Sequence, residues 1–279
     1  MPVYLEAWLI IFVKSLNTWM IEKLDRAGSV LVRNMEFAGF TILLLLKSLY
    51  YFKNIFGKRH EIIKQLYYAG VKTFPVISIV ALFTGMVLGL QMGIEMKAYH
   101  QEIHIGGVVI ATLTREMAPF TAAIILIASV GSAMAAELGT MKVSEEIDAL
   151  EIMSISVEKY LVMPRIAALA VMMPVATVYV NVMGSIGGAV VAKSHLNISY
   201  GLYYHVLLEH LHFKAVYVGL LKAFVFGLGI SSISCAQGLR AENGALGVGR
   251  ATRDAVVASF IMVLIIGYYI TEFFFRFGL

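Results

Sequence analysis

The chain has 279 residues, of which 59% are hydrophobic and only 14% are charged, and its formal net charge is +4. Its mean hydropathy is +0.82. Soluble domains are nearer half apolar and a quarter charged, so this composition excludes an ordinary soluble domain. It predicts an all-α integral membrane protein with several spans. The single cysteine, Cys235, excludes a disulfide framework and a Cys-based metal site.

Residues 1–60 are predicted to form a cytoplasmic or interfacial helical region. Phe37–Leu46 is a run of ten uncharged, largely apolar residues, which is too short to cross about 30 Å of hydrocarbon as a helix. Basic and aromatic residues follow it directly, and this combination is typical of a helix that lies in the membrane interface. A tilted span over Phe37–Phe56 is the alternative.

Residues 61–279 are predicted to form a membrane domain with five transmembrane helices. Each apolar run is long enough to span. The expected spans cover residues 74–94, 106–136, 166–192, 215–236 and 255–275. Glycines recur at four-residue spacing at Gly85, Gly89 and Gly93, which favours close helix packing.

The distribution of Lys and Arg predicts the orientation of these spans. The loops on one side, together with the N-terminal region, hold sixteen basic residues, and those on the other side hold four. By the positive-inside rule the N-terminus and residues 137–165 are cytoplasmic, and the C-terminus is on the outer side. An odd number of spans makes a homo-oligomer the natural way to enclose a pathway.

Four charged residues fall inside predicted spans: Arg115, Glu116 and Lys222 lie well within them, and Glu272 lies near the end of the last one. Charges at membrane depth are costly and face protein or a water-filled cavity. Arg115 and Glu116 either neutralise each other or form a polar site that meets a charged head group, and an arginine suits a phosphate. Lys222 either snorkels, pairs with an acid on another span, or faces the same cavity.

The segment Glu137–Arg165 is the longest polar interlude between the strongly apolar runs, and it is rich in acids. Ser144 is expected to cap a short helix in which Ile147 and Leu150 share one face. The segment is either a solvated surface loop or a docking element for a soluble partner.

No catalytic or metal site is expected. The external histidines at positions 195, 205, 210 and 212 lie near Glu209 without an HExxH motif. GVGRAT (Gly247–Thr252) is not a phosphate loop, because GxxxxGK[ST] is absent. The chain is therefore expected to bind no cofactor and to hydrolyse no ATP, so an ATP-driven process needs a separate ATPase chain.

Five segments, in order along the chain, resemble the MlaE family, the permease subunits of MCE-associated, Mla-type ABC lipid transporters. They are GMVLGLQ (Gly85–Gln91), TREMAP (Thr114–Pro119), GSAMAAELGTMKVSEEIDALEIM (Gly131–Met153), YLVMPR (Tyr160–Arg165) and GVGRAT. The resemblance covers the chain from about Arg26 onward.

The resemblance implies a homodimer of five-span subunits in the inner membrane, each preceded by an interfacial helix. It implies a cytoplasmic ATPase that binds ATP and Mg, an MCE-domain protein on the outer side, and no nucleic acid partner. Phospholipid is expected in an outward-facing cavity at the dimer interface, moving between the inner and outer membranes. The family positions that line this cavity correspond to Leu88, Gln91, Tyr99, Arg115 and Glu116. An ATP-independent secondary lipid transporter or scramblase is the alternative function.

The resemblance also implies that the segment between spans 2 and 3 is a coupling helix for the ATPase. The residues expected there are Glu137, Met141, Glu145, Glu146, Asp148, Leu150 and Glu151. The chain departs from the family pattern at Ala128-Ser129-Val130, where an Ala-Gly pair followed by an arginine is frequent, and at Ser156-Val157, where Asp or Asn followed by a proline is frequent.

Overall fold

The computed structural model describes residues 28–29, 32–33 and 35–276. The chain divides into two units, Met1–Leu43 and Leu44–Leu279, which are described separately. In the first unit residues 35–43 are helical. The segment before residue 28 lies outside the described residues.

The second unit begins with helical residues 44–51, followed by the 3-10 helix η1 (Phe52–Lys58) and by α2 (Arg59–Ala69). The α-helix thus changes to a 3-10 helix at Phe52. The segment 37–56, the alternative tilted span, is not among the described helices that are long and apolar enough to cross a membrane. The position of this region in the membrane interface stays a prediction.

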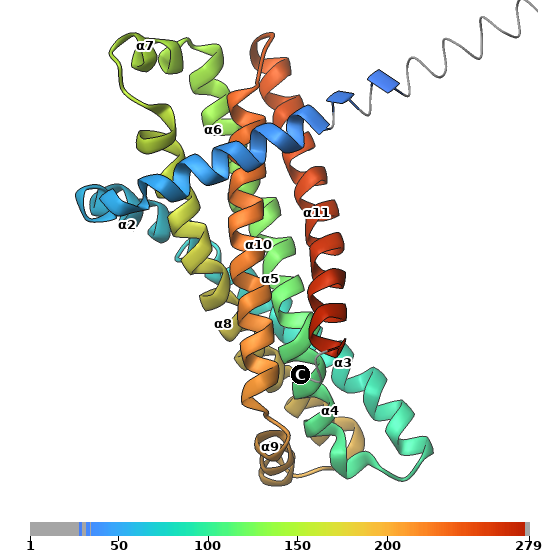
Figure 1. Ribbon diagram of the computed structural model, residues 1–279. Coiled ribbons are helices and arrows are strands. Elements are labelled where there is room, and N and C mark those ends of the chain that lie inside the picture. The colour runs from blue at the N-terminus through green and yellow to red at the C-terminus, as the bar shows by residue number, and fades with distance from the viewer. Residues whose placement is uncertain (1–27, 30–31, 34, 277–279) are drawn as a thin grey trace, which may run out of the picture. The chain divides into compact units, whose positions relative to one another are not determined.

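Five helical stretches of the described chain are long and apolar enough to span, which confirms the predicted all-α, five-span fold (Figure 1). They cover Phe74–Ala98, Glu102–Val143, Glu158–Leu196, Phe213–Leu239 and Gly244–Arg276. No strand occurs among residues 28–29, 32–33 and 35–276. Each stretch is longer than its apolar run, because helical hydrogen bonding continues past the charged residues at its ends.

The spans consist of the following elements. The first is α3 (Phe74–Ala98). The second joins η2 (Glu102–His104), α4 (Ile105–Thr112), η3 (Leu113–Met117), α5 (Ala118–Leu126), η4 (Ile127–Gly131) and α6 (Ser132–Val143). The third joins η5 (Glu158–Val162) and α8 (Met163–Leu196), and the last two are α10 (Phe213–Leu239) and α11 (Gly244–Arg276). Two short helices lie between spans, α7 (Glu146–Ile152) and α9 (Tyr200–Glu209), at opposite ends of the bundle (Figure 1).

Helices α3 and α8 pack backbone against backbone. A Cβ atom on Gly85 would collide with the backbone of Gly184, and one on Gly187 would collide with the carbonyl of Leu82. The spacing of glycines along α3 therefore meets matching glycines on α8. Small residues at such contacts are the usual means by which membrane helices approach closely.

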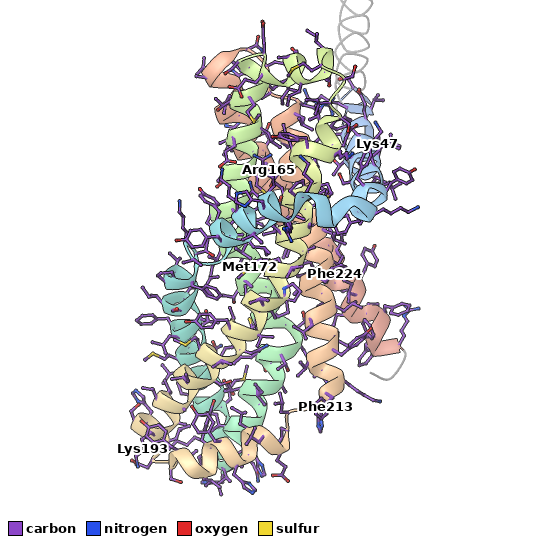
Figure 2. All side chains as sticks on the ribbon, turned by 90° about the vertical axis from the view of Figure 1, so that its left-hand side faces the viewer. Lys47, Arg165, Met172, Lys193, Phe213 and Phe224 are labelled. Atoms are coloured by element: carbon purple, nitrogen blue, oxygen red, sulfur yellow. The ribbon has the colours of Figure 1, made fainter. Side chains whose placement is uncertain are left out.

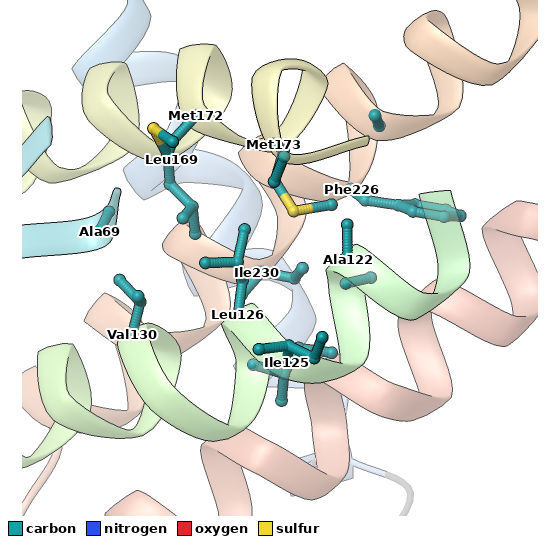
Figure 3. Close-up of a cluster of buried hydrophobic side chains, with 14 of the residues drawn as sticks. Ala69, Ala122, Ile125, Leu126, Val130, Leu169, Met172, Met173, Phe226 and Ile230 are labelled. Atoms are coloured by element: carbon teal, nitrogen blue, oxygen red, sulfur yellow. The ribbon is translucent and has the colours of Figure 1, made fainter. Parts of the chain in front are cut away.

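The main hydrophobic core lies where α5, α8 and α10 meet, and Figure 3 shows part of it. Leu126, Leu169, Met173 and Ile230 are fully buried there. Outside this core, α11 is the least buried span, with 11% of its most apolar window covered by the rest of the chain. Lipid or another protein must cover its apolar surface, because water is a poor solvent for it.

We expect the substitution Gly85→Val to destabilise the protein strongly. The new side chain meets the Gly184 backbone, which cannot move aside as a flexible side chain would. Overpacking of this kind costs about 1–3 kcal/mol or more. The unfolding temperature of the purified protein in detergent measures the effect.

Gly249→Ala is the matched control, because a Cβ atom at this helical position meets nothing within 4 Å. It should leave the unfolding temperature unchanged or raise it slightly, since alanine favours a helix more than glycine does. Equal effects of the two substitutions would contradict the backbone contact.

Candidate functional site: a charged cluster in the spans and the α7 segment

Lys222 is the centre of a polar cluster that joins three spans. Its side chain is 2% exposed. Its ammonium donates to Glu116 Oε1 at 2.6 Å, to the carbonyl of Arg115 at 2.9 Å and to Thr271 Oγ1 at 2.8 Å. These contacts use all three N–H groups of the lysine. Of the alternatives open for Lys222, pairing with an acid on another span is observed, and the lysine also lines the two cavities beside Glu116.

The local backbone explains how a carbonyl of η3 can accept a hydrogen bond from Lys222. Pro119 has no N–H to donate to the carbonyl of Arg115 four residues earlier, and this carbonyl accepts from Lys222 instead. Gly219 lies one turn before Lys222, and a Cβ there would collide with the carbonyl of Thr114. The glycine therefore lets α10 come close enough for the lysine to reach η3.

Thr271 on α11 completes the cluster. Its hydroxyl lies 2.9 Å from Glu116 Oε1 and 2.8 Å from the carbonyl of Gly267 in its own helix. Sequence reasoning missed this residue, because a threonine in an apolar run carries no charge that marks it. The only available signal was the need of a buried lysine for further acceptors.

Arg115 is not neutralised by its neighbour Glu116. Its side chain is exposed, and it makes no ion pair or side-chain hydrogen bond with the described part of the chain. It lines a small cavity of about 60 Å³ with Glu116, Thr271 and Phe274. The interpretation of Arg115 and Glu116 as a mutually neutralising pair was therefore wrong. Adjacent residues of a helix point about 100° apart and do not face each other.

A larger cavity of about 290 Å³ opens beside the same cluster. Glu116 and Lys222 supply its polar edge, and Phe120, Phe226 and Tyr268 form part of its apolar wall. The combination of an apolar wall with a few charged groups suits an amphipathic ligand.

The other residues predicted to contact lipid lie on α3 or at its end. Leu88 packs against a second core cluster that contains Leu113, whereas Gln91 and Tyr99 are exposed. None of these three residues lines either cavity beside Glu116. Within one chain, the structure thus brings Arg115 and Glu116 together with Lys222 and Thr271 but does not gather the five predicted residues around one space.

The α7 segment, residues 144–157 between α6 and η5, projects from the end of α6. Ile147 is buried and Leu150 is half-buried, while Glu145, Glu146 and Glu151 are exposed. This arrangement agrees with the face assigned to the two apolar residues. Lys142 on α6 binds Asp148 on α7 at 2.6 Å, which ties the short helix to the span before it.

The start of α7 differs from the expectation. Its N-cap is Glu145 in a left-handed conformation, with φ of 60°, and no side chain caps the helix. The Ser144 hydroxyl instead donates to the Thr140 carbonyl at 2.9 Å. The predicted serine cap was wrong, because the chain turns one residue later and the serine stays hydrogen-bonded to α6.

The base of the segment is held by ion pairs to neighbouring elements. Glu137 on α6 accepts from Arg165 on α8 at 3.0 Å. Glu158 in η5 accepts from Lys47 at 3.0 Å, and this hydrogen bond raises the pKa of the Lys47 ammonium. Figure 2 labels Arg165 and Lys47 at this end of the spans.

Two apolar side chains beyond Glu151 were not among the named coupling residues. Ile152 is 85% exposed and Met153 is 61% exposed. Apolar residues this exposed outside the spans are typical of a contact surface. Their apolar character at the end of an acidic helix was the signal available in the sequence.

The histidines at the α9 end of the bundle do not gather into a metal site. His104 and His210 lie with ring centroids 6.3 Å apart. The described residues contain no group of three or more His, Cys, Asp or Glu that could hold a metal ion.

The sequence matches the family described as permease MlaE over residues 62–273. The chain belongs to the MlaE permease family. It is 41% identical over 215 residues to a probable ABC transporter permease protein of Rickettsia bellii, covering 77% of this chain and 83% of that one. A probable ABC transporter permease protein of Synechocystis is 35% identical over 218 residues, or 78% of this chain and 83% of its own length.

A plant relative shows the same similarity over a longer segment. The chloroplastic protein trigalactosyldiacylglycerol 1 of Arabidopsis thaliana is 31% identical over 243 residues, which are 86% of this chain and 66% of the plant protein. The chain is thus a multi-pass membrane protein and a permease subunit, and membership of this family implies an ATPase partner.

We expect Glu116→Gln to destabilise the protein more than Lys222→Met. The glutamine leaves a buried ammonium without its carboxylate, whereas the methionine removes the charge and keeps most of the volume. About 1–3 kcal/mol is expected for Glu116→Gln, because Glu116 is 45% exposed and a fully buried pair would lose more. Thermal unfolding in detergent measures the order.

The double substitution measures the interaction between Lys222 and Glu116 apart from the contribution of each residue alone. Lys222→Met with Glu116→Gln should cost less than the sum of the two single changes, since the buried charge is gone. Arg115→Gln is the control and should change stability little. Additive costs would show that the two residues do not depend on each other.

Proposed function

We propose that the protein is the transmembrane permease subunit of an ATP-driven ABC transporter that moves phospholipids between inner and outer membranes. The observation that carries the proposal is an exposed Arg115 beside a carboxylate already held by Lys222. The Glu116 carboxylate is engaged by two other groups. The arginine therefore keeps its charge and its donors for a ligand.

Phosphate is the ligand chemistry that this site favours. A guanidinium presents paired donors that match phosphate oxygens, and it cannot lose its proton in a protein. The neighbouring cavity of about 290 Å³ has an apolar wall that suits acyl chains. The name of the plant relative contains that of a glycolipid, trigalactosyldiacylglycerol, and this supports a lipid cargo.

A homodimer is the proposed assembly. The apolar surfaces of α3 and α11 are largely uncovered within the chain, and a second copy would cover part of them. In this proposal the lipid lies in an outward-facing cavity at the interface, where Leu88, Gln91 and Tyr99 join Arg115 and Glu116.

The proposed ATPase contact is the α7 segment. Exposed acids there lie beside the exposed Ile152 and Met153, so the surface offers both charge and apolar anchors. ATP and Mg bind to the partner chain in this proposal.

The excess of basic residues at the α7 end supports a cytoplasmic N-terminus and a periplasmic C-terminus in an inner membrane. An MCE-domain protein would then meet the periplasmic end.

Replacement of two contact residues should uncouple the ATPase. We expect Glu151→Lys with Ile152→Asp to weaken association with the ATPase subunit at least tenfold, because the change removes an apolar anchor and reverses a charge. Co-purification and lipid-stimulated ATP hydrolysis of the reconstituted complex measure this. Leu246→Asp is the control, since Leu246 is also an exposed apolar residue, 77% exposed, at the start of α11. Normal association and normal transport in the double variant would overturn the assignment of α7.

Arg115→Ala should reduce the phospholipid that co-purifies with the complex severalfold while leaving the unfolding temperature nearly unchanged. The side chain is exposed and unpaired within the described chain, so its loss breaks no internal contact. Mass spectrometry of extracted lipid measures the ratio of phospholipid to protein, and Arg115→Lys should retain part of it. An unchanged ratio in Arg115→Ala would contradict a phosphate contact at this residue. Gradient-driven lipid transport by the permease alone would instead support a secondary transporter or scramblase.

A further inference from the structure

A cavity of about 460 Å³ lies at the α7 end of the spans, far along the bundle from Arg115. It is bounded by α2, by α6 at Glu137 and by the joined segment η5–α8. It shares no lining residue with the two cavities beside Glu116. The lipid-cargo proposal therefore leaves this space without a role.

The charged lining of the cavity is basic in balance. Lys64, Lys72 and Arg165 line it, and the acids there are Glu61 and Glu137. Glu137 is already bound by Arg165 at 3.0 Å. The two lysines are exposed and make no ion pair within the described part of the chain. An anion in this space would therefore meet at least two ammonium groups that are not neutralised.

Arg165 adds a buried donor at the wall of the cavity. The residue is 6% exposed, and its guanidinium donates to the Leu161 carbonyl at 3.1 Å as well as to Glu137. Its Nε–H has no acceptor among the described residues. Buried donors in folded proteins nearly always have a partner. An oxygen-rich ligand at this wall would supply acceptors to an arginine that has donors to spare.

Aromatic residues place the cavity at the level of the lipid head groups. Tyr67, Tyr68 and Tyr160 line it, and the Lys72 ammonium lies 4.6 Å from the ring centroid of Tyr68. Four residues separate the end of α2 from the start of the span α3, and Arg165 lies in the first turn of α8. Tyrosine and lysine at the ends of spans are typical of the membrane–water boundary.

We propose that this cavity binds the phosphate of an anionic phospholipid from the leaflet at the α7 end of the bundle. Basic pockets between helices at a membrane surface are established sites for anionic head groups. A lipid in this cavity would lie against α2, α6 and the start of α8 at once. It would thus act as a bound structural or regulatory lipid, separate from the cargo at Arg115.

The test uses the full-length protein purified in an uncharged detergent and titrated with phosphatidylglycerol or phosphatidylcholine. Native mass spectrometry counts the lipids bound. Lys64→Gln with Lys72→Gln should weaken phosphatidylglycerol binding about tenfold or more and leave phosphatidylcholine unchanged. Glu61→Gln should strengthen phosphatidylglycerol binding, because it removes the acid that is not held by Arg165.

Matched controls distinguish binding at this cavity from an effect of net charge and from binding of the cargo lipid. Lys193→Gln with Lys214→Gln removes the same charge at the opposite end, where Figure 2 shows Lys193, and should change nothing. The effect of the Lys64 and Lys72 substitutions should persist in Arg115→Ala protein, which makes it independent of the cargo proposal. All four lysines are exposed, so unfolding temperatures should stay equal.

Four results would overturn the proposal. The first is unchanged phosphatidylglycerol binding in the Lys64 and Lys72 variant, and the second is an equal loss in the control variant. The third is displacement of phosphatidylglycerol by inorganic phosphate at equal concentration, which would indicate a free-anion site. Displacement of the lipid by the purified ATPase subunit would equally overturn it, in favour of a protein contact.

Discussion

A buried ammonium group in a membrane span is the constraint on which the half of the bundle away from α7 depends. Lys222 is expensive to place there, and it is tolerated because three acceptors converge on it from two other spans. One acceptor is a backbone carbonyl that Pro119 leaves without its usual donor. Another is Glu116, whose charge is thereby used inside the protein. The exposed charge that remains in the cluster belongs to Arg115, and this is why the cluster presents a cation to its surroundings.

Close backbone contacts make this convergence possible. Gly219 lets α10 approach the carbonyl of Thr114, and Lys222 follows one turn later on the same helix. The same principle holds α3 against α8 through Gly85 and Gly184. Van der Waals contact between backbones is a main source of helix association in a membrane, where apolar side chains gain little by leaving lipid. Glycine positions thus determine which polar groups can reach each other.

These contacts also explain what the sequence could predict. Apolar runs separated by charged loops were enough for the five spans, and the spacing of glycines in α3 indicated a tight helix contact. The partner of Glu116 was harder to predict, because the pairing depends on how three helices that lie far apart in sequence are rotated about their axes. Helix geometry alone argues against Arg115 as the partner of Glu116, since the side chains of adjacent residues diverge. Thr271 could be found only after Lys222 was known to need acceptors. Serine favours a helix N-cap, but the Ser144 hydroxyl donates instead to a carbonyl of the preceding helix.

The α7 segment shows how a very short helix can be held in place by its surroundings. Seven residues are too few for a stable helix in isolation, so its position rests on tertiary contacts. Ile147 is buried, and Lys142 binds Asp148 across the turn. Glu137 and Glu158 then anchor the flanking segments to Arg165 and Lys47. Span 2 runs without a break from this anchored end to Glu116, about 30 Å away at 1.5 Å per residue. A displacement of α7 would therefore act on the same helix that carries Arg115, and the two π-helical segments in that span are the places where its hydrogen bonding departs from the regular α pattern.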